Sequence, residues 1–327
     1  MGTDGPGTRR RGAATALLLA AAAALSPLAG CTGGTHDDGS GHGRSPSTGP
    51  SQSAGSGPVL AVKIDNVAPA RPQTGLDAAD VVYAEQVEGG LSRLMAVYAT
   101  RFPRSVGPVR SARESDLELL RQFTRPVLAF SGAQRRLLPL IDRAPLEAES
   151  PEKAASGAYY RGTDRAAPHN LYVRPDRLVP SAPGAAALTT GFRYGAAPSG
   201  GTPETSRTVR YPAARFTFTW SAGRGRWLVS TDGSPTVTTD GTRVAPATVV
   251  VQHVTVRRSA YHDVLGNHTP YTETVGSGQA EVLRGGRSYE ARWTRARADG
   301  GTEFTGADGA AVNFAEGQVW VVFVAAG

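Results

Sequence analysis

Two arginines, Arg110 and Arg113, stand where the sequence predicts the start of a helix, and there they could hold an anion. Gly107-Pro108 interrupts the chain before them, and Ser111 and Glu114 have the S-x-x-E spacing of a capping box. The free N–H groups of a helix start favour negative charge, and a guanidinium offers paired donors to a carboxylate, a phosphate or an acidic sugar. The sequence therefore predicts an anion-binding corner at this helix start.

Further acids, amides and arginines that could serve a site precede and follow this corner. Most of them come at the ends of predicted strands or in loops, where α/β sheets collect ligand-binding residues. The same arginines and glutamates could instead pair with one another and tie loops together, because structural ion-pair networks look alike in sequence. The candidate ligand-binding residues are Asp65, Asn66, Arg71, Glu88, Arg93, Arg110, Arg113, His169 and Asn170, with Glu85 as a further carboxylate.

Acid–base chemistry is the alternative use of these residues. A histidine titrates near neutral pH, so His169 with a carboxylate could act as a base, although a loop histidine bonded to backbone would look the same. Glu85 and Glu88 would face opposite sides of a strand, which disfavours a glycosidase-type pair of those two, whereas a pair of Asp65 with Glu88 or Glu85 stays open. Because the sequence has no G-x-S-x-G or P-loop motif, no catalytic residue is assigned.

No metal and no cofactor are expected. The second half of the chain contains His253, His262, Asp263 and His268, but these residues lack the H-E-x-x-H or cysteine spacing of a metal site. Aromatic residues there are expected to form a β core rather than a sugar platform. These residues are Trp220, Trp227, Trp293 and Trp320.

The segment before residue 58 has the features of export and anchoring sequences. Arginines at 9–11 precede an apolar run over 13–25 that is too short and too rich in alanine for a good membrane span. Leu28-Ala-Gly-Cys31 then resembles the lipobox of bacterial lipoproteins, whose cysteine receives a diacylglyceryl group. An ordinary secretory signal with a chance cysteine is the alternative. Lipidation of Cys31, the only cysteine, would account for a lone thiol in an exported chain.

Residues 1–30 are therefore expected to be a signal peptide, and residues 31–57, rich in Gly, Ser, Thr and Pro, a disordered tether. The protein is expected on the outer face of the cell membrane, held there by the lipid on Cys31. Its expected partners are a cell-wall polymer, an anionic ligand or an envelope protein. Nucleic acid is not expected, because the net charge of +7 is spread along the chain.

An α+β fold with two domains is predicted. Residues 58–190 are expected to form an α/β domain with a mixed sheet. Residues 204–327 contain many short alternating runs separated by Asp-Gly turns, which predict a mainly antiparallel β domain. The elements expected in the first domain are a strand at Val59–Ile64, a Gly-Gly hairpin of Val81–Val87 with Leu91–Thr100, the capped helix, a strand at Val127–Phe130 and a helix at Gln134–Asp142.

The order of several motifs resembles the YerB-like family of bacterial lipoproteins. The resemblance covers nearly everything after the predicted tether and implies a two-part extracellular lipoprotein. It implies no activity, substrate or catalytic residue. The motifs are Ile64-Asp-Asn66, Ala70-Arg-Pro-Gln-Thr-Gly-Leu76, Ala79-Asp-Val-Val-Tyr83, Val87-Glu-Gly-Gly90, Ser92-Arg93, Val106-Gly-Pro-Val-Arg-Ser-Ala-Arg113, Arg161 to Arg165, Ala167-Pro-His-Asn-Leu-Tyr172, Gly276-Ser-Gly278, Gly285-Gly286, Trp293 and Gly317-Gln-Val-Trp320.

Three hypotheses follow for the function. The first is a non-enzymatic, lipid-anchored envelope protein that binds a ligand or partner at the arginine corner. The second is a hydrolase or transferase that acts on an envelope polymer, with Asp65, Glu88 or His169 as acid or base. The third is a structural role in which all these charged groups pair internally. They differ in geometry. An enzyme requires a carboxylate or histidine within hydrogen-bond reach of a pocket in a partly closed cleft, a binding module can have the arginine corner on an open face, and the structural role needs no cleft.

Overall fold

The computed structural model describes residues 1–2, 57–263 and 266–327, and the described residues from Gly57 onward belong to one compact folded unit. Cys31, the predicted tether and almost all of the predicted signal peptide lie outside the described residues. In the part of the chain that is described, no helix is long and apolar enough to cross a membrane.

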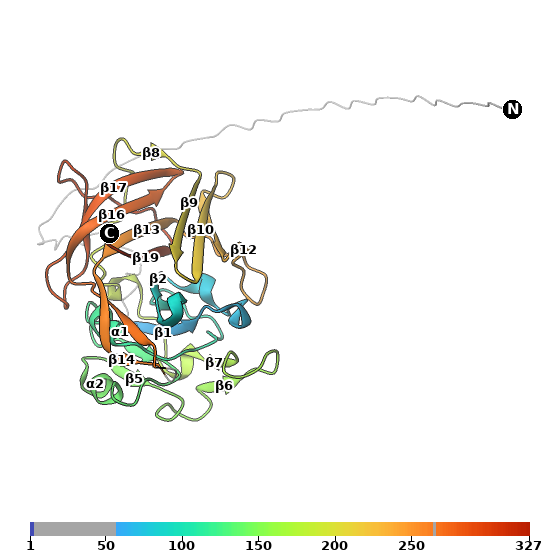
Figure 1. The fold of residues 1–327 in the computed structure, drawn as a ribbon, viewed down its shortest axis with the longest axis vertical. Coiled ribbons are helices and arrows are strands. Elements are labelled where there is room, and N and C mark those ends of the chain that lie inside the picture. Colours follow the sequence, from blue (N-terminus) through green and yellow to red (C-terminus); the bar gives the residue numbers. More distant parts are fainter. Residues whose placement is uncertain (3–56, 264–265) are drawn as a thin grey trace, which may run out of the picture. The chain divides into compact units, whose positions relative to one another are not determined.

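A mixed sheet of 11 strands forms the centre of the folded unit (Figure 1). Its strands are β1 (Leu60–Asp65), β2 (Val81–Gln86), β3 (Ser92–Tyr98), β4 (Val127–Ala129), β5 (Glu147–Glu149), β8 (Thr202–Pro203), β13 (Thr248–Val254), β16 (Gly276–Arg284), β17 (Arg287–Arg295), β18 (Glu303–Thr305) and β19 (Val319–Ala325). They lie in the order β18-β17-β16-β13-β19-β2-β3-β1-β4-β5, and β8 pairs with β17. The predicted strand at Val59–Ile64 and the β2–β3 hairpin are confirmed.

The last strand of the chain joins the two halves of this sheet. β19 lies between β13 and β2 and runs parallel to both, so that Val321 is opposite Val250 on one side and Tyr83 on the other. The sheet therefore runs through strands from both predicted domains. Most strand pairs of the second half are antiparallel, as predicted. β19 is an exception, because it pairs with strands far from it in sequence rather than with a hairpin neighbour.

A second, antiparallel sheet packs on one face of the large sheet. It consists of β9 (Ser206–Tyr211), β10 (Ala214–Ser221), β11 (Arg226–Thr231) and β12 (Ser234–Pro235). The rings of Phe216 and Phe218 pack edge-to-face with Trp320 at centroid distances of 6.0 and 5.9 Å. Trp227, Trp293 and Trp320 are buried in the core, as predicted, and Trp220 is half-buried against Trp227.

Two short helices pack on the opposite face of the large sheet. α1 (Glu114–Leu120) has seven residues and α2 (Leu138–Arg143) has six. Side chains of both helices share a core with alternate residues of the central strands, including Tyr83 and Val321. Because these helices are so short, the first half of the chain is largely β and not the α/β domain that the sequence predicted. The mixed character of its sheet is as predicted.

The start of α1 differs from the predicted capping box. The N-cap is Arg113 rather than Ser111, and the carboxylate of Asp116 accepts a hydrogen bond of 2.7 Å from the Arg113 N–H. The chain before the helix cannot turn earlier, because the N–H of Ala112 donates to the carbonyl of Gly132 and holds the segment extended. That partner lies 20 residues further along the chain, so the local spacing did not reveal it. α2 also begins later than predicted.

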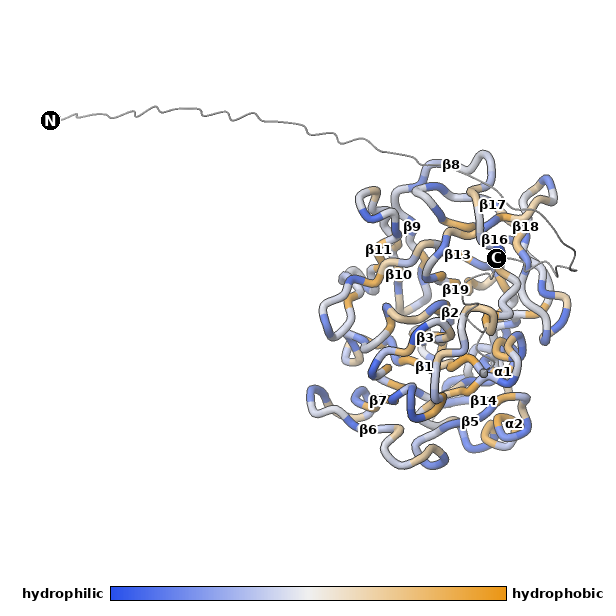
Figure 2. The backbone as a smooth tube through the Cα atoms, turned by 180° about the vertical axis from the view of Figure 1, so that it is seen from behind, coloured by the Kyte–Doolittle hydropathy of each residue, from blue (hydrophilic) through white to orange (hydrophobic). Residues whose placement is uncertain are grey.

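Two small hairpins lie outside the main sheets. One consists of β6 (Tyr159–Arg161) and β7 (Leu171–Val173), and the other of β14 (Val256–His262) and β15 (His268–Thr272). The β14–β15 hairpin follows β13 and lies beside α1, which β15 contacts (Figure 1). Figure 2 shows apolar residues along the strands of the large sheet and polar residues in many of the connecting loops. Because β15 contacts α1, the β14–β15 hairpin brings residues of the second half of the chain next to the first half.

Candidate functional site

A cleft of 710 Å³ lies between the β14–β15 hairpin and the segment that precedes α1. The end of β1, the turn between β2 and β3, the loop before α2 and the loop before β7 supply its other walls. The volume falls in the range of roughly 300–1,000 Å³ that is usual for small-molecule sites. Six of the nine predicted ligand-binding residues line the cleft, namely Asp65, Glu88, Arg93, Arg110, Arg113 and His169.

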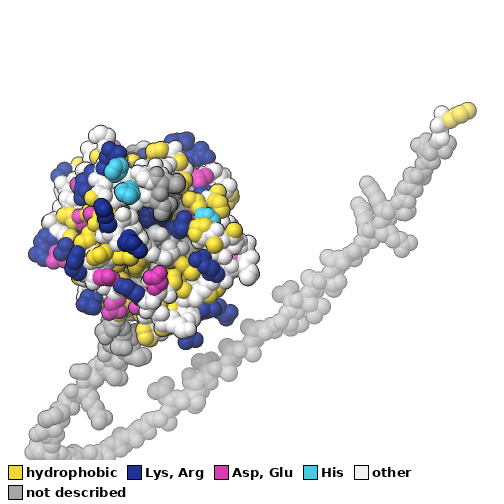
Figure 3. Space-filling model, turned by 60° about the horizontal axis from the view of Figure 1, so that its bottom comes forward, with side chains coloured by type: hydrophobic (Ala, Val, Ile, Leu, Met, Phe, Trp, Pro, Cys, Tyr) yellow, Lys and Arg dark blue, Asp and Glu magenta, His cyan; other side chains and the backbone are white. Residues whose placement is uncertain are grey.

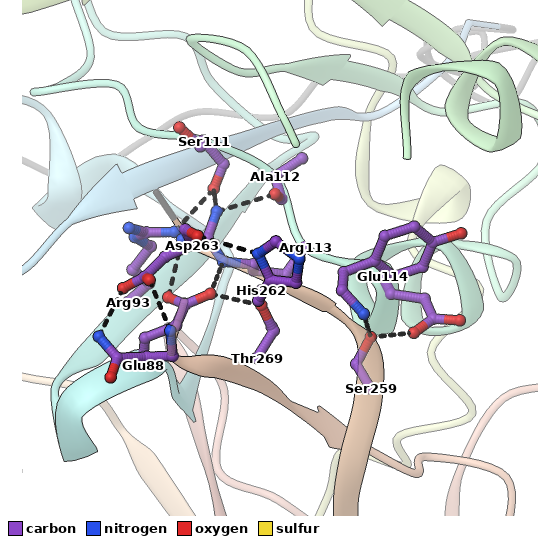
Figure 4. A network of polar contacts seen from close by, with 12 residues as sticks. Glu88, Arg93, Ser111, Ala112, Arg113, Glu114, Ser259, His262, Asp263 and Thr269 are labelled. Carbon is purple, nitrogen blue, oxygen red and sulfur yellow. Dashed lines mark hydrogen bonds and ion pairs between the residues drawn. The ribbon is translucent and has the colours of Figure 1, made fainter. Parts of the chain in front are cut away.

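Arg113 is fully engaged within the protein (Figure 4). Its Nε lies 2.7 Å from Oε1 of Glu88 and its Nη2 lies 2.8 Å from Oε2. Nη1 donates to the carbonyls of Ser111 and Ala112, at 3.4 and 3.1 Å. Both side chains of the ion pair are largely buried, with 12% of Arg113 and 7% of Glu88 exposed. Arg113 therefore ties the start of α1 to the turn between β2 and β3.

The carboxylate of Glu88 is held ionised by its partners. Burial acts to raise its pKa, but the hydrogen bonds and charge of Arg113, together with the Thr269 hydroxyl, outweigh burial, so the pKa lies below its ordinary value. Thr269 donates from β15 at 2.5 Å to the oxygen that also faces Arg113 Nε. Glu88 thus joins three segments of the chain, and in this state it is a poor general acid.

Arg110 has a different environment from Arg113. Its Nε lies 3.1 Å from Oδ2 of Asp65, an ion-pair distance, but the N–H does not point at that oxygen closely enough to make a hydrogen bond. No group in the described ranges accepts a hydrogen bond from its guanidinium, and 27% of its side chain is exposed. Of the two arginines predicted at this corner, Arg110 is the one whose donors can reach a ligand.

Asp65 and His169 form a second polar pair in the cleft. The Nδ1 of His169 lies 2.9 Å from Oδ2 of Asp65, the same oxygen that faces Arg110. Asp65 is 1% exposed at the C-terminal end of β1, while 21% of the His169 side chain is accessible. An ionised Asp65 favours the tautomer with the proton on Nδ1, which leaves Nε2 as a proton acceptor.

Arg93 is a third arginine in the lining of the cleft. It donates from Nη1 to the carbonyl of Ser111 at 3.2 Å. Burial, with the nearby charge of Arg113, lowers the pKa of its guanidinium to about 10, so it stays protonated at neutral pH. Arg93 therefore contributes positive charge to the lining of the cleft and fixes the backbone before α1.

The remaining three candidates do not line the cleft and are engaged in contacts within the protein. Arg71 forms an ion pair with Asp232 and donates twice to the carbonyl of Asn66, at 3.0 and 2.8 Å. Asn66 itself is buried and donates to the Ser92 hydroxyl at 2.8 Å. Asn170 accepts from Arg161 and donates to the carbonyl of Gly162. The structure thus gives these residues the role of tying loops together.

The predicted anion site at the helix start is not supported by the local geometry. α1 has only seven residues, and the carboxylate of Asp116 already accepts the N–H of its N-cap residue, Arg113. Negative charge from the chain itself therefore faces the N-terminus of the helix. Any anion bound in this cleft would depend on arginine side chains rather than on the helix end.

A buried ionic cluster under the site was missed in the sequence. Lys63 is fully buried in β1, forms an ion pair with Glu85 and lies 2.7 Å from Oδ1 of Asp116. Ser115 donates to the other Glu85 oxygen at 3.1 Å. Burial raises the pKa of Glu85, and the charge of Lys63 partly offsets this effect. A lysine within an apolar run is the signal that could have indicated such a cluster.

The β14–β15 hairpin is the other part of the site that sequence reasoning missed. Three glutamates of the first half of the chain accept its hydrogen bonds. Glu88 accepts from Thr269 and Glu114 from Ser259, the latter at 2.5 Å (Figure 4). Glu118 accepts from Tyr271 at 3.0 Å. Tyr261, His262 and Asp263, which the hairpin also supplies, line the cleft. In the sequence, His262 and Asp263 suggest only a metal site. In the described residues, no group of three or more His, Cys, Asp or Glu could hold a metal ion.

Arginines and carboxylates are equally numerous in the described lining of the cleft. Its described lining contains four arginines and four carboxylates, plus two histidines. Figure 3 shows basic side chains spread among acidic and apolar ones over one face of the molecule. Local ion pairs rather than a broad basic field therefore decide where an anion can bind. The charged groups are Arg93, Arg110, Arg113 and Arg135 against Asp65, Glu88, Glu114 and Asp263.

The fold and site define a mostly β protein, with one mixed sheet shared by both halves of the chain and an arginine-lined cleft beneath a hairpin. This chain belongs to the family described as "Protein of unknown function (DUF3048)". Residues 47–188 match the N-terminal domain of that family and residues 207–321 match its C-terminal domain.

Two comparisons with YerB of Bacillus subtilis agree with this assignment. A segment of 64 residues is 44% identical to "Putative lipoprotein YerB" of strain 168, and it spans only 20% of this chain and 19% of that relative. The crystal structure of YerB from the same species superposes with a TM-score of 0.66 at 21% identity, over 82% of this chain and 90% of that chain. The predicted resemblance is thus confirmed, and the structural match shows a shared fold.

Proposed function

We propose that this chain is an envelope protein, held to the outer face of the cell membrane by a lipid on Cys31, whose cleft binds a ligand through an anionic group. The lipobox-like sequence Leu28-Ala-Gly-Cys31 and the name of the B. subtilis relative support the anchor. An acidic envelope glycan, a phosphate-containing polymer or an acidic partner segment has the required chemistry.

The environment of Arg110 is the observation that carries the proposed binding. Its guanidinium faces the cleft, and its terminal nitrogens donate to none of the described groups. The guanidinium of Arg113, three residues later, already donates hydrogen bonds to the Glu88 carboxylate and to backbone carbonyls. A guanidinium with two free donors is the group that recognises a carboxylate or phosphate in a bidentate way.

A thermal-shift titration of the purified full chain tests this binding. Two pairs of probes differ only in the anionic group: D-glucuronate with D-glucose, and glycerol 3-phosphate with glycerol. We expect at least one anion to raise the melting temperature while its neutral analogue does not, because binding to the native state alone stabilises it. Arg110→Gln should abolish the shift, and Arg104→Gln, at an exposed arginine outside the cleft, should retain it.

Acid–base catalysis on an envelope polymer is the second candidate, and the Asp65–His169 pair favours it. A buried carboxylate that orients a partly accessible histidine beside a cleft is an arrangement suited to a general base. Incubation with isolated cell-wall polymer should then release reducing ends or phosphate, and His169→Gln should lose that release while Arg104→Gln keeps it. If the wild type releases nothing, catalysis on that polymer is ruled out and binding remains.

A further inference from the structure

An exposed leucine stands at the same cleft as Arg110. Leu91, directly before β3, is 38% exposed, and only two other large apolar side chains in the described part of the folded unit reach a similar exposure, Leu140 at 36% and Tyr194 at 38%. Neither of those two lines this cleft. Half-buried Val67 and Tyr261 add apolar surface to its lining. Apolar surface that stays exposed in a cleft is favourably covered by an apolar part of a ligand.

The charge balance of the cleft limits the charge of that ligand. The described lining contains four arginines and four carboxylates, so it has no net charge when its histidines are neutral. Within it, Glu88 neutralises Arg113 and Asp65 lies beside Arg110. A polyanion would therefore gain little from the overall field and would approach the carboxylates of Glu114 and Asp263. A single anionic group, in contrast, can take the two terminal donors of Arg110.

We propose that the ligand of this cleft is an amphipathic monocarboxylate, with its carboxylate on Arg110 and an aliphatic group against Leu91, as at the carboxyl end of a peptide that finishes in an apolar residue. This inference rests on the proposed anion binding and names the class of ligand. A planar carboxylate matches the two Nη donors that remain after Asp65 occupies the Nε side. The aliphatic group covers apolar surface that the protein leaves exposed.

Isothermal titration calorimetry of the full chain measures how much the carboxylate and the aliphatic group each contribute to affinity. N-acetyl-L-leucine carries both groups, N-acetylglycine only the carboxylate, and N-acetyl-L-leucinamide only the aliphatic group. We expect N-acetyl-L-leucine to bind about tenfold more tightly than N-acetylglycine, because roughly half of a leucine side chain leaves water. N-acetyl-L-leucinamide should bind no more tightly than N-acetylglycine. Diethyl phosphate, a monoanion of different shape, should bind more weakly than N-acetyl-L-leucine.

Two matched leucine variants complete the test. Leu91→Gln should remove most of the preference for N-acetyl-L-leucine over N-acetylglycine, whereas Leu140→Gln, at an equally exposed leucine outside the cleft, should preserve it. Equal Arg110-dependent affinity for both carboxylates, or tighter binding of diethyl phosphate, would overturn this inference and leave the proposed anion binding intact. If no anion, including glucuronate and glycerol 3-phosphate, bound in an Arg110-dependent way, both proposals would fail.

Discussion

The guanidinium of Arg113 and the carboxylate of Glu88 form a bidentate ion pair, with Nε 2.7 Å from Oε1 and Nη2 2.8 Å from Oε2. The pair joins the start of α1 to the turn between β2 and β3, and Thr269 of the β14–β15 hairpin donates to the same carboxylate. Arg110, three residues before Arg113, faces the cleft with its terminal nitrogens free of described partners. The two arginines of one short motif therefore have different environments.

Replacing Arg113 should cost stability rather than ligand binding. Arg113→Ala leaves the carboxylate of Glu88 largely buried without its cation, so we expect the free energy of unfolding to fall by about 2–4 kcal/mol. Arg104→Ala, at an exposed residue without a hydrogen bond or ion pair to any described group, should change it by less than about 0.5 kcal/mol. Urea unfolding measures both values, and equal stability of the two variants would show that the ion pair contributes nothing.

The same ion pair should make stability depend on pH. The pKa of Glu88 is lower in the folded protein than the ordinary value of 4.5 in an unfolded chain. Its contribution is therefore complete above the unfolded pKa and is lost as the pH falls through the folded pKa. Urea unfolding across the acidic range should show a steeper loss of stability for the wild type than for Glu88→Gln. Parallel curves for the two proteins would contradict this assignment.

Lys63 is expected to be the most costly single charge to remove. Lys63→Met leaves the carboxylates of Glu85 and Asp116 buried together, so we expect a loss of about 3–5 kcal/mol in the free energy of unfolding. The double variant Lys63→Met/Glu85→Gln removes one of the two negative charges and should recover part of the loss. Chemical denaturation of the three proteins checks this, and a double variant less stable than Lys63→Met would argue against an ionic cluster.

Glu118 should stabilise the β14–β15 hairpin against local opening. Its Oε1 accepts the backbone N–H groups of Thr274 and Val275, at 2.8 and 3.2 Å, and its Oε2 accepts the Tyr271 hydroxyl at 3.0 Å. Glu118→Ala should speed amide hydrogen exchange in β14 and β15 by about tenfold or more, because a hydrogen bond to a charged group contributes over 1 kcal/mol. Glu118→Gln keeps one acceptor and should show a smaller change, and exchange in β9 to β12 should be unaffected. Uniform acceleration would instead indicate global destabilisation.

The elements of the fold that could be predicted from the sequence are those whose structure depends on residues close together in the chain. The apolar run before Asp65 gives β1, and the two glycines after Glu88 give the turn between β2 and β3. Gly90 needs its left-handed backbone, with φ of 71°, and a Cβ there would come within 2.5 Å of Pro212. The insertion of β19 between β13 and β2 depends on pairings across most of the chain, which no local pattern encodes.

The candidate site was predictable as a set of residues but not as a set of contacts. Asp65, Arg110 and His169 were all selected from their residue types, and they meet at one carboxylate oxygen. Sequence alone could not tell which arginine Glu88 would neutralise, because that depends on the path of the chain around Ala112. The contribution of Thr269 was also hidden, since its hairpin reaches the cleft from the other half of the chain.

The most direct test of the central claim follows the arginine side chains themselves during a titration. The Nε–H signals of Arg110 and Arg113 can be assigned by NMR on ¹⁵N-labelled protein through the Arg110→Gln and Arg113→Lys variants. On addition of N-acetylglycine, we predict a saturable shift of the Arg110 signal and a nearly constant Arg113 signal, because Glu88 already occupies Arg113. A constant Arg110 signal, or a larger shift at Arg113, would contradict the assignment of Arg110 as the ligand-binding arginine.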